Sequence, residues 1–501
     1  MLIEGKLGEI RQQTGELVVV SLFEGDNKIG ERTAALDAVI GGRIQALIGW
    51  GDFKGRLGES ALLYPGVAGL ADRVLLVGLG KSDEFDAARE RQVAATVARK
   101  AQSLGITTFA TVLHGASAGQ LSHGLAAQAL AEGTILAGYR GDLHRTVKDD
   151  EDPGKAVERV SVLVENEAQL PEVESGIRAG QVIASAANWA RDLVNQPANC
   201  MTPRALADEA HRMAVEAGLG FELLGPEEMR KLGMGALLGV AQGSAEEPRF
   251  IVLEHKPQGQ TGQPVVFVGK GITFDSGGIS LKNQDGMEKM KGDMAGAAAV
   301  LAAMQATAAL AIPMWVIGLI PATENLPSGT AYRPGDVLTS ITGKTIEVIS
   351  TDAEGRLILA DALGYSQRYN PKAVVDLATL TGACVVALGN IAAGLFANDD
   401  GLATRVETAS RASGEKVWRM PLWREYAEQI KSDVADMKNT GGRPAGAITG
   451  AMLLSKFVGT TPWVHLDIAG VSASEKDTPV QPRGATGYGV RLLVQLLRDW
   501  H

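Results

Sequence analysis

The sequence predicts an α/β protein, in which an N-terminal α/β domain is joined by a long helix to a larger C-terminal α/β domain with a central, mostly parallel sheet. Three observations lead to this prediction. Short β-branched runs alternate with helical patterns, the apolar runs of the C-terminal part are continuous, and 501 residues exceed one ordinary core. We expect domains at 1–165 and 195–501, with the connecting helix at 166–194.

The N-terminal part alternates between strand and helix patterns. The β-branched runs predict strands at 15–24, 72–78, 107–113 and 158–165, and the patterns between them predict helices at 83–103 and 124–138. Apolar residues recur at roughly helical spacing over 166–194. Thr202 and Pro203 are typical of an N-cap followed by proline in the first turn, which predicts a helix over 203–217.

The C-terminal part has the continuous apolar runs of a parallel sheet that is covered on both faces. These runs predict strands at 250–254, 264–269, 314–320, 345–350, 373–377 and 463–468. Residues 484–500 predict a glycine-rich turn followed by an amphipathic helix. Residues 295–322 are uncharged and long enough to span a membrane, but their many alanines and Pro313 favour a buried helix followed by a buried strand.

Charge and cysteine content exclude several classes of protein. The 48 Lys and Arg residues against 58 Asp and Glu residues give a net charge of −10, which excludes a general attraction to nucleic acid or to an anionic membrane. Two cysteines, Cys200 and Cys384, exclude a disulfide framework and a cysteine-rich metal site. The N-terminus has no apolar core of a secretory signal. We therefore expect a cytoplasmic protein.

Charged residues concentrate at two junctions between a predicted strand and a loop, at 268–296 and 350–357. Strands of an open α/β sheet end at a common crevice, so Lys270, Asp275, Asp352 and Glu354 can project into one cleft. Asp293, at the start of a helix expected over 293–310, can join them. So many carboxylates in a dry cleft require cations or strongly raised pKa values. Oxygen ligands suit divalent Mg, Mn or Zn.

Several of these residues also have a simpler interpretation. Thr351 to Glu354 can form a capping box, and Asp275 to Gly278 is a common turn sequence. Lys282 and Arg356 would be surface cations by default. The residues around Lys270 do not match a phosphate-binding loop.

A rival catalytic pattern is G-x-S-x-G at 115–119, where Ser117 follows a predicted strand and His465 lies downstream as a possible base. The helix of a nucleophile elbow should follow at once, but GQLSHG intervenes. His465 and Asp467 alternate on one face of a predicted strand, where packing is the default role. No histidine pair has the spacing of a zinc site.

At the two charged junctions the sequence closely resembles the leucyl aminopeptidase family, which comprises cytosolic two-metal exopeptidases that form homohexamers. The most specific match is STDAEGRL at 350–357, where the family has NTDAEGRL. Further matches are NQPANCMTP (195–203), VGKGITFDSGGISLK (268–282), MKGDMAGAAAV (290–300) and HLDIAG (465–470). The resemblance spans at least 195–491, and LLVGLGKSDEF (75–85) extends it more weakly into the N-terminal domain.

The resemblance implies a metallopeptidase domain at 195–501 that binds two divalent metal ions per subunit, Mn or Zn foremost and Mg or Co as alternatives. The implied metal ligands are Lys270, Asp275, Asp293, Asp352 and Glu354. Asp275 and Glu354 would bridge the ions, and Lys270 would bind as a neutral amine, because adjacent dications depress its pKa.

The resemblance also implies the catalytic and substrate-binding residues. Arg356 would hold a bicarbonate ion that serves as general base, and Lys282 would polarise the scissile carbonyl and stabilise the oxyanion. The implied side-chain pocket consists of Met290, Thr379, Gly382 and Ala469, which suits an apolar first residue such as leucine. Ser350 stands where the family has asparagine, which bears on substrate preference.

The expected function is therefore metal-dependent removal of the N-terminal amino acid from peptides and amino-acid amides. The expected partners are peptides with a free N-terminus and other copies of the chain in a homohexamer. A two-metal phosphoesterase could use the same carboxylates. A DNA-binding role of the hexamer is the non-enzymatic alternative, but the basic cluster Arg89, Arg91, Arg99 and Lys100 shares its helix with Asp86 and Glu90. We expect no binding to nucleic acid or membranes.

Overall fold

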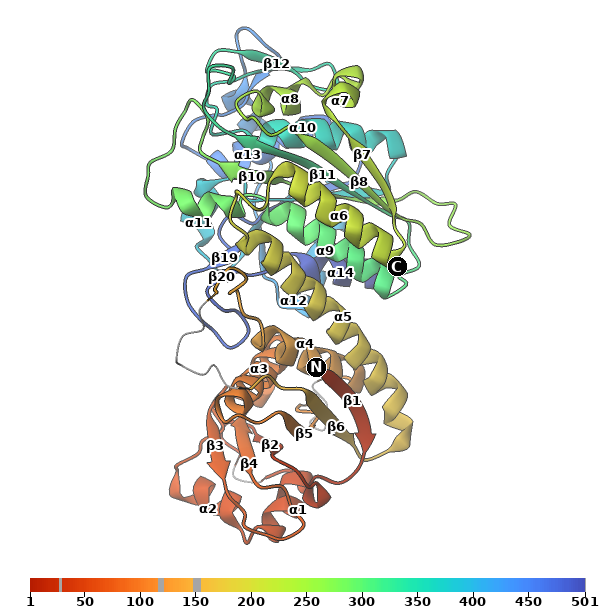
Figure 1. Cartoon of the computed structure of the whole chain (residues 1–501), viewed down its shortest axis with the longest axis vertical. Helices are drawn as coiled ribbons and strands as arrows, with labels where there is room; N and C mark the ends of the chain where they lie inside the picture. Colours follow the sequence, from red (N-terminus) through yellow and green to blue (C-terminus); the bar gives the residue numbers. More distant parts are fainter. Residues whose placement is uncertain (27–28, 116–120, 147–154, 501) are drawn as a thin grey trace. The chain divides into compact units, whose positions relative to one another are not determined.

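The computed structural model describes residues 1–26, 29–115, 121–146 and 155–500, so Ser117 lies outside the described residues. The chain divides into two compact units (Figure 1). Unit 1 comprises Met1–Ser185 and Lys476–Pro482, and unit 2 comprises Ala186–Glu475 and Arg483–His501. The division falls within the long helix α5 (Leu170–Asn195), which the sequence predicts at 166–194.

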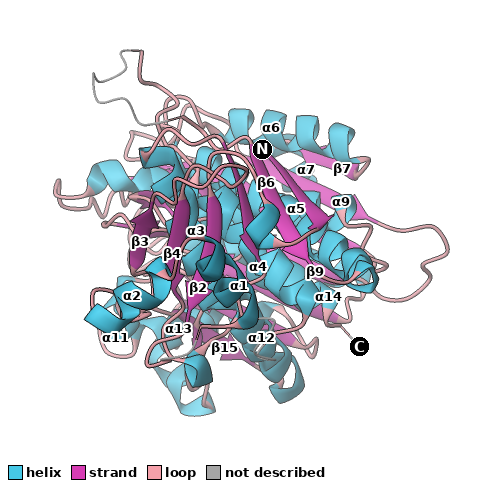
Figure 2. Ribbon diagram, turned by 90° about the horizontal axis from the view of Figure 1, so that it is seen from below, coloured by secondary structure: helices cyan, strands magenta, loops and turns pink. Residues whose placement is uncertain are grey.

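Unit 1 contains a six-stranded sheet with the order β1-β6-β5-β2-β4-β3. All neighbours pair in parallel except β3 and β4, and Figure 2 shows β3, β4 and β2 side by side. The bounds are β1 (Leu2–Leu7), β2 (Val18–Leu22), β3 (Ser60–Leu63), β4 (Val74–Gly78), β5 (Thr108–Val112) and β6 (Arg159–Val164). The sequence predicts four of them. It misses β1, which carries charges of both signs, and β3, which has four residues.

Helices cover both faces of this sheet because successive strand residues are apolar. Val19 and Val77 belong to one core with Val93 and Leu130, from α3 (Ala87–Ser103) and α4 (His123–Ala137). Their neighbours along the strands form a second core with α1 (Glu31–Val39) and α2 (Arg43–Trp50). The two cores lie on opposite faces, since side chains alternate along a strand.

Unit 2 contains a nine-stranded sheet with the order β16-β15-β18-β14-β9-β11-β8-β7, and β10 pairs with β11. The central strands β18, β14, β9 and β11 are parallel, and antiparallel pairs flank them. The bounds are β7 (Gly220–Leu224), β8 (Arg249–His255), β9 (Val265–Gly269), β10 (Gly271–Asp275), β11 (Val316–Asn325), β14 (Ala373–Ala378), β15 (Ala393–Ala397), β16 (Val417–Arg419) and β18 (Trp463–Asp467).

Two layers of helices enclose this sheet (Figure 1). One layer contains α6 (Pro203–Ala217), α9 (Ala295–Ala309), α12 (Asp400–Ser413) and α14 (Val490–Arg498). The other contains α8 (Gly235–Ala241), α10 (Gly355–Ser366) and α13 (Gly446–Leu454). The buried alanine-rich helix and the strand after it are confirmed as α9 and β11. Among the described residues, no helix is long and apolar enough to cross a membrane.

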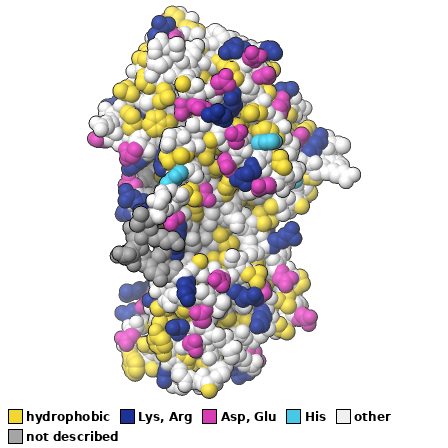
Figure 3. Space-filling view, viewed as in Figure 1, with side chains coloured by type: hydrophobic (Ala, Val, Ile, Leu, Met, Phe, Trp, Pro, Cys, Tyr) yellow, Lys and Arg dark blue, Asp and Glu magenta, His cyan; other side chains and the backbone are white. Residues whose placement is uncertain are grey.

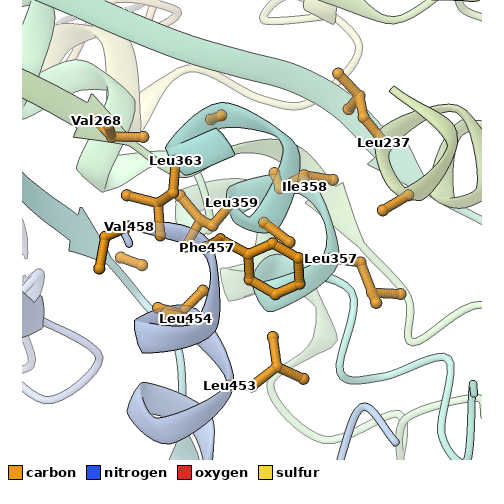
Figure 4. Packing of buried hydrophobic residues seen from close by; sticks show 14 of the residues in the cluster. Leu237, Val268, Leu357, Ile358, Leu359, Leu363, Leu453, Leu454, Phe457 and Val458 are labelled. Atoms are coloured by element: carbon orange, nitrogen blue, oxygen red, sulfur yellow. The ribbon is translucent and has the colours of Figure 1, made fainter. Parts of the chain in front are cut away.

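The packing of α10 against α13 fixes the start of α10, which follows one of the charged junctions. Figure 4 shows Leu359 of α10 in one buried cluster with Leu454 and Phe457. Burial of each such side chain contributes about 1.5–3 kcal/mol. The first turn of α10 is therefore held in place by its own apolar face.

The expectation that 345–350 is a strand of the parallel sheet is wrong. Within this segment, β13 (Thr345–Glu347) pairs with β12 (Val337–Thr339) and β17 (Met437–Lys438) in a separate three-stranded sheet. Ile346 and Val348 are buried, whereas Glu347 between them is half-buried. This alternation is typical of a strand with one covered face.

Candidate metal centre

The charged residues of unit 2 gather where its parallel strands end. Lys270 follows β9 directly, Asp275 is the last residue of β10, and Thr379 follows β14. Glu354 precedes the first residue of α10. Because β9, β11 and β14 run in parallel, their carboxyl ends meet at one edge of the sheet, as expected for an α/β site.

Three buried carboxylates form the centre of the site. One carboxylate oxygen from each of Asp275, Asp293 and Glu354 lies within 4.8 Å of the others, and this is the one such acidic group found among the described residues. Lys270 Nζ lies 2.7 Å from Asp293 Oδ2 and 2.9 Å from Glu354 Oε1. The ammonium group therefore supplies positive charge that the buried acids require.

A second lysine reaches the site from the solvent side. Lys282 Nζ lies 2.8 Å from Asp275 Oδ2 and also forms an ion pair with Asp352. The side chains of Lys282 and Asp352 are 24% and 39% exposed, so both lie at the mouth of the site. The structure thus brings together all five residues that the sequence suggests as metal ligands, four of them buried.

Burial and mutual repulsion set the pKa values of this group. Burial raises the pKa of Asp293 and of Asp275, and the nearby charge of Glu354 adds to both shifts. Burial alone would lower the pKa of Lys270, but the surrounding carboxylates raise it above its usual range. The pKa of Glu354 is lowered, because the two lysines outweigh the effect of burial. The site therefore carries more acid than its lysines can balance.

The buried carboxylate oxygens of the site fit a divalent cation. Glu354 Oε2 is buried without a hydrogen bond, whereas Asp293 Oδ2 lies 2.7 Å from Lys270 Nζ. Asp275 Oδ1 accepts hydrogen bonds from Asn325 Nδ2 at 2.8 Å and from Gly277 N at 2.9 Å, which orients its second oxygen toward the site. Buried oxygens in this state are the ligands that hard divalent ions prefer.

Two glycines allow the backbone to approach the charged groups. Gly277 has a φ of 89°, and a Cβ there would lie 3.0 Å from Asp352 Oδ1. A Cβ at Gly355 would lie 2.6 Å from Lys270 Cε. Larger residues at either position would displace a proposed ligand.

The structure does not support the capping-box interpretation of Thr351 to Glu354. The hydroxyl of Thr351 donates to the carbonyl of Gly277 and accepts from the backbone N–H of Ser280. Glu354 itself occupies the N-cap of α10 without a side-chain capping bond. Asp293 likewise lies just before α9, which begins at Ala295, rather than within it.

Arg356 is buried in the first turn of α10 and is not a surface cation. Its Nη1 donates to the carbonyl of Asn439 at 2.8 Å, whereas its Nε is buried without a partner. Burial lowers the pKa of this guanidinium. A buried guanidinium with an unused donor is suited to bind a small anion.

The expected pocket residues lie around the same strand ends. Thr379 donates from its hydroxyl to Asp293 Oδ1 at 2.6 Å, and its carbonyl accepts from Lys270 Nζ at 2.8 Å. Gly382 begins α11 (Gly382–Leu388), and the backbone N–H of Ala469 donates to Asp467 Oδ1 at 3.2 Å. Met290 lies in the short helix Met287–Gly292, which contacts β10.

Sequence reasoning missed the buried polar residues that hold this site. Asn325 ends β11, so the same strand-end rule would have identified it. Asn439 lies in a loop, where the sequence gives no signal. His465, for which the sequence favours a packing role, is buried, with Nδ1 at 2.6 Å from Asp376 Oδ1 and its ring stacked on Trp463.

Comparison with known proteins identifies the family of this chain. Residues 188–494 match the catalytic domain of the cytosol aminopeptidase family, and residues 19–148 match its N-terminal domain. The chain belongs to the cytosol aminopeptidase family. It is a hydrolase, a metal-dependent aminopeptidase.

Relatives from bacteria cover nearly the whole chain. The Probable cytosol aminopeptidase of Roseiflexus castenholzii is 49% identical, over 91% of this chain and 92% of that protein. The Probable cytosol aminopeptidase of Geotalea uraniireducens is 47% identical, over 92% of each chain.

Solved structures confirm the α/β fold. A mutant tomato leucine aminopeptidase is 37% identical with a TM-score of 0.87, and the match covers 99% of this chain and 96% of that one. The bottromycin maturation enzyme BotP in complex with Mn is 36% identical with a TM-score of 0.84, and the match covers 96% of this chain and 99% of that one.

Proposed function

We propose that this aminopeptidase removes leucine and other apolar residues from the N-terminus of peptides and from amino-acid amides, and that 195–501 is its catalytic domain. The observation that carries the proposal is the group of three buried carboxylates, one of which, Glu354, has a buried oxygen without a hydrogen bond. Two divalent ions, Mn or Zn foremost and Mg or Co as alternatives, would be held by Lys270, Asp275, Asp293, Asp352 and Glu354.

Asp275 and Glu354 would each help to hold both ions. Asp275 is fixed by Asn325 and by the backbone of Gly277, and Glu354 is fixed at the N-terminus of α10. Lys270 would release its proton to act as a neutral ligand, since cations beside it reverse the effect that the carboxylates have on its pKa. When bound, the ions polarise a carbonyl and lower the pKa of a bound water molecule.

Lys282 and Arg356 are the proposed catalytic residues. Lys282 lies at the mouth of the site, where its ammonium can donate to the oxygen of the scissile carbonyl as negative charge develops on it. Arg356 has a buried Nε without a partner, which can hold a bicarbonate ion. At this position Arg356 would place a general base beside the attacking water.

Small and apolar residues favour an apolar substrate side chain. Met290, Thr379, Gly382 and Ala469 would form the pocket for the first residue, and methionine adapts to different apolar shapes. Ser350 takes the place of the asparagine usual in the family, and its hydroxyl accepts from the backbone N–H of Asp352 at 3.3 Å. The exact preference among apolar residues is therefore part of the proposal.

We propose peptides with a free N-terminus as substrates, a homohexamer as the assembly and the cytoplasm as the location. The charges do not favour a nucleic-acid partner, since acidic and basic side chains are interspersed on the face in Figure 3. Arg91 of the basic cluster is buried against Glu132, and Arg89 pairs with Glu84 at 2.6 Å. These two ion pairs neutralise two of the four charges in the basic cluster.

Hydrolysis of leucine anilide tests the proposal. Activity should disappear on chelation and return with one or more of Mn, Zn, Mg and Co when each is added back. A leucyl peptide should lose its first residue, whereas its N-acetyl form should survive, because acetylation removes the amine lone pair that would bind a metal. Efficient cleavage of the acetylated peptide, or activity that survives complete removal of metal, would contradict the proposal.

A further inference from the structure

Asn439 connects two parts of the site from a distant segment of the chain. It follows β17 and is fully buried. Its Oδ1 accepts from the backbone N–H groups of Ile349 at 2.8 Å and Ser350 at 3.3 Å. Its Nδ2 donates to the carbonyls of Ser350 at 2.7 Å and Ala353 at 3.5 Å. Its own carbonyl accepts from Arg356 Nη1 at 2.8 Å.

The loop that Asn439 holds carries two of the proposed metal ligands. Residues 349–354, which we call the ligand loop, include Asp352 and Glu354 and have no regular secondary structure. The middle of the ligand loop is held from another direction, where Asn325 Nδ2 and the Tyr332 hydroxyl both donate to the carbonyl of Thr351. Asn439 therefore holds the ligand loop on both sides of Thr351, through the carbonyls of Ser350 and Ala353.

The side chain at position 439 must combine two kinds of hydrogen bond. Two N–H groups of the ligand loop require an acceptor, and two carbonyls require a donor. A primary amide offers both at one end of a short side chain, whereas a carboxylate lacks the donors and an alanine lacks both. The chemistry of the loop backbone thus explains why an asparagine stands here.

We propose that Asn439 is a positioning residue, which fixes the ligand loop and the Arg356 guanidinium relative to each other so that metal ligands and anion site stay aligned. This inference rests on the proposed function of these residues. Without the amide, two N–H groups and two carbonyls lose partners, and the ligand loop would shift toward water to satisfy them. Such a shift would move Asp352 and Glu354, although Asn439 itself contacts neither carboxylate.

Asn439→Ala in the full chain tests the inference. We expect the Kd for Mn²⁺, measured by calorimetry on chelator-treated protein, to rise about 10–100-fold, as for other residues that orient metal ligands. The kcat for leucine anilide at saturating Mn²⁺ should fall by a similar factor, with KM changed by less than about threefold, because Asn439 does not line the pocket. In metal-free protein, backbone amides of 349–353 should exchange hydrogen faster.

Asn398→Ala is a control in the same unit, because this asparagine also bonds backbone groups through both ends of its amide but is exposed. Asn398 Oδ1 accepts from Trp463 N at 2.7 Å, and its Nδ2 donates to the carbonyl of Thr461 at 2.9 Å. It contacts the start of β18, whereas the metal centre lies where the parallel strands end. Its substitution should lower the melting temperature and leave Mn²⁺ affinity and kcat unchanged. Equal effects of the two substitutions would overturn the inference, since both would then report general stability.

Asn439→Ser keeps a hydroxyl and is measured in the same way if the alanine variant does not fold. Wild-type Mn²⁺ affinity and kcat in a folded Asn439 variant would overturn the inference and leave the proposed function intact. If the wild-type chain itself bound no metal and cleaved no leucine anilide, the proposed function would fail. The inference would then fail with it, whatever the exchange data showed.

Discussion

Both units contain a largely parallel sheet between helices, but charge is arranged differently where the strands end. In unit 2, Asp275, Asp293 and Glu354 are buried and close together. In unit 1, Glu165 follows β6 with its side chain 60% exposed, and it pairs with Arg32. His114, which follows β5, is buried among hydroxyl groups instead of carboxylates.

The difference shows that the sheet edge alone does not make a metal centre. Unit 1 has a cavity of about 640 Å³ at its strand ends, lined among others by Ser21, Thr33 and Glu165. Among the described residues, however, unit 1 has no group of buried carboxylates that could hold an ion. A parallel sheet provides a place for a ligand, and the buried charges determine the chemistry.

Exchanging a carboxylate for an amide at the strand ends of each unit should give the largest difference in turnover and metal content between the two units. Glu354→Gln should abolish turnover and reduce bound metal below two ions per chain, because a neutral amide cannot balance two dications. Asp352→Asn should behave in the same way. Metal content by mass spectrometry and leucine anilide hydrolysis provide the measurements.

Glu165→Gln is the control at the edge of unit 1. It removes a half-exposed ion pair, and such pairs contribute about 0–1 kcal/mol. Metal content and kcat should stay at wild-type values. If Glu354→Gln kept full activity and metal while only its stability fell, Glu354 would be a structural residue of the N-terminus of α10.

Most of the fold could be predicted from the sequence, because its strands are buried on both faces. Continuous apolar runs marked β8, β9, β14 and β18 within a few residues. The prediction for 345–350 was wrong, because Ile346 and Val348 lie on the one buried face of a strand in a separate small sheet. An alternation over only three residues is too short to distinguish a strand that is buried on one face from a strand that is buried on both faces.

The charged part of the site could also be predicted, since Lys270 directly follows the apolar strand β9 and Asp275 lies a few residues further along. The residues that orient the charges could not. Asn439 acts through backbone groups 89 and 90 positions away, so its partners depend on how two loops fold together. The burial of Arg356 has the same origin, because its guanidinium is covered by segments distant in sequence.

Lys282→Ala tests the role of the ammonium group at the mouth of the unit 2 site. We expect a loss of about 10²–10³ in kcat, as for removal of one donor to an oxyanion, with a smaller change in KM. Lys289→Ala is a suitable control, because Lys289 pairs with the exposed Glu475 at 3.1 Å. A defect confined to KM in Lys282→Ala would assign this lysine to substrate binding.

Arg356→Ala tests the buried guanidinium, which has no counterpart of this kind at the unit 1 edge, where Arg32 pairs with Glu165. We expect a loss of about 10² in kcat, at the lower end for general base catalysis, because water can partly replace the held base. Added bicarbonate should raise the kcat of the wild type and have little effect on the kcat of the variant. A variant that bicarbonate restored fully would show that Arg356 does not hold the anion.

The smallest effect on catalysis is expected at His114, on the edge of unit 1. Its ring nitrogens lie 3.0 Å from Ser21 Oγ and 3.2 Å from Thr111 Oγ1, and burial lowers its pKa from 6.5 to about 4. Between these values the unfolded chain binds a proton that the folded chain does not. Stability should therefore fall as the pH drops from about 6.5 to about 4, by about 3 kcal/mol in total.

His114→Gln can keep both hydrogen bonds and removes the titration. Hydrogen exchange of β2 and β5 in the full chain, measured between pH 4 and 7 and corrected for the intrinsic pH dependence of exchange, should show acid destabilisation in the wild type and a weaker dependence in the variant. The kcat at pH 7 should be unchanged, because the proposed catalytic residues and metal ligands all lie in unit 2. Equal acid sensitivity in both proteins would mean that His114 has the same pKa in the folded and the unfolded chain, and a lowered kcat would show that the two edges are not independent.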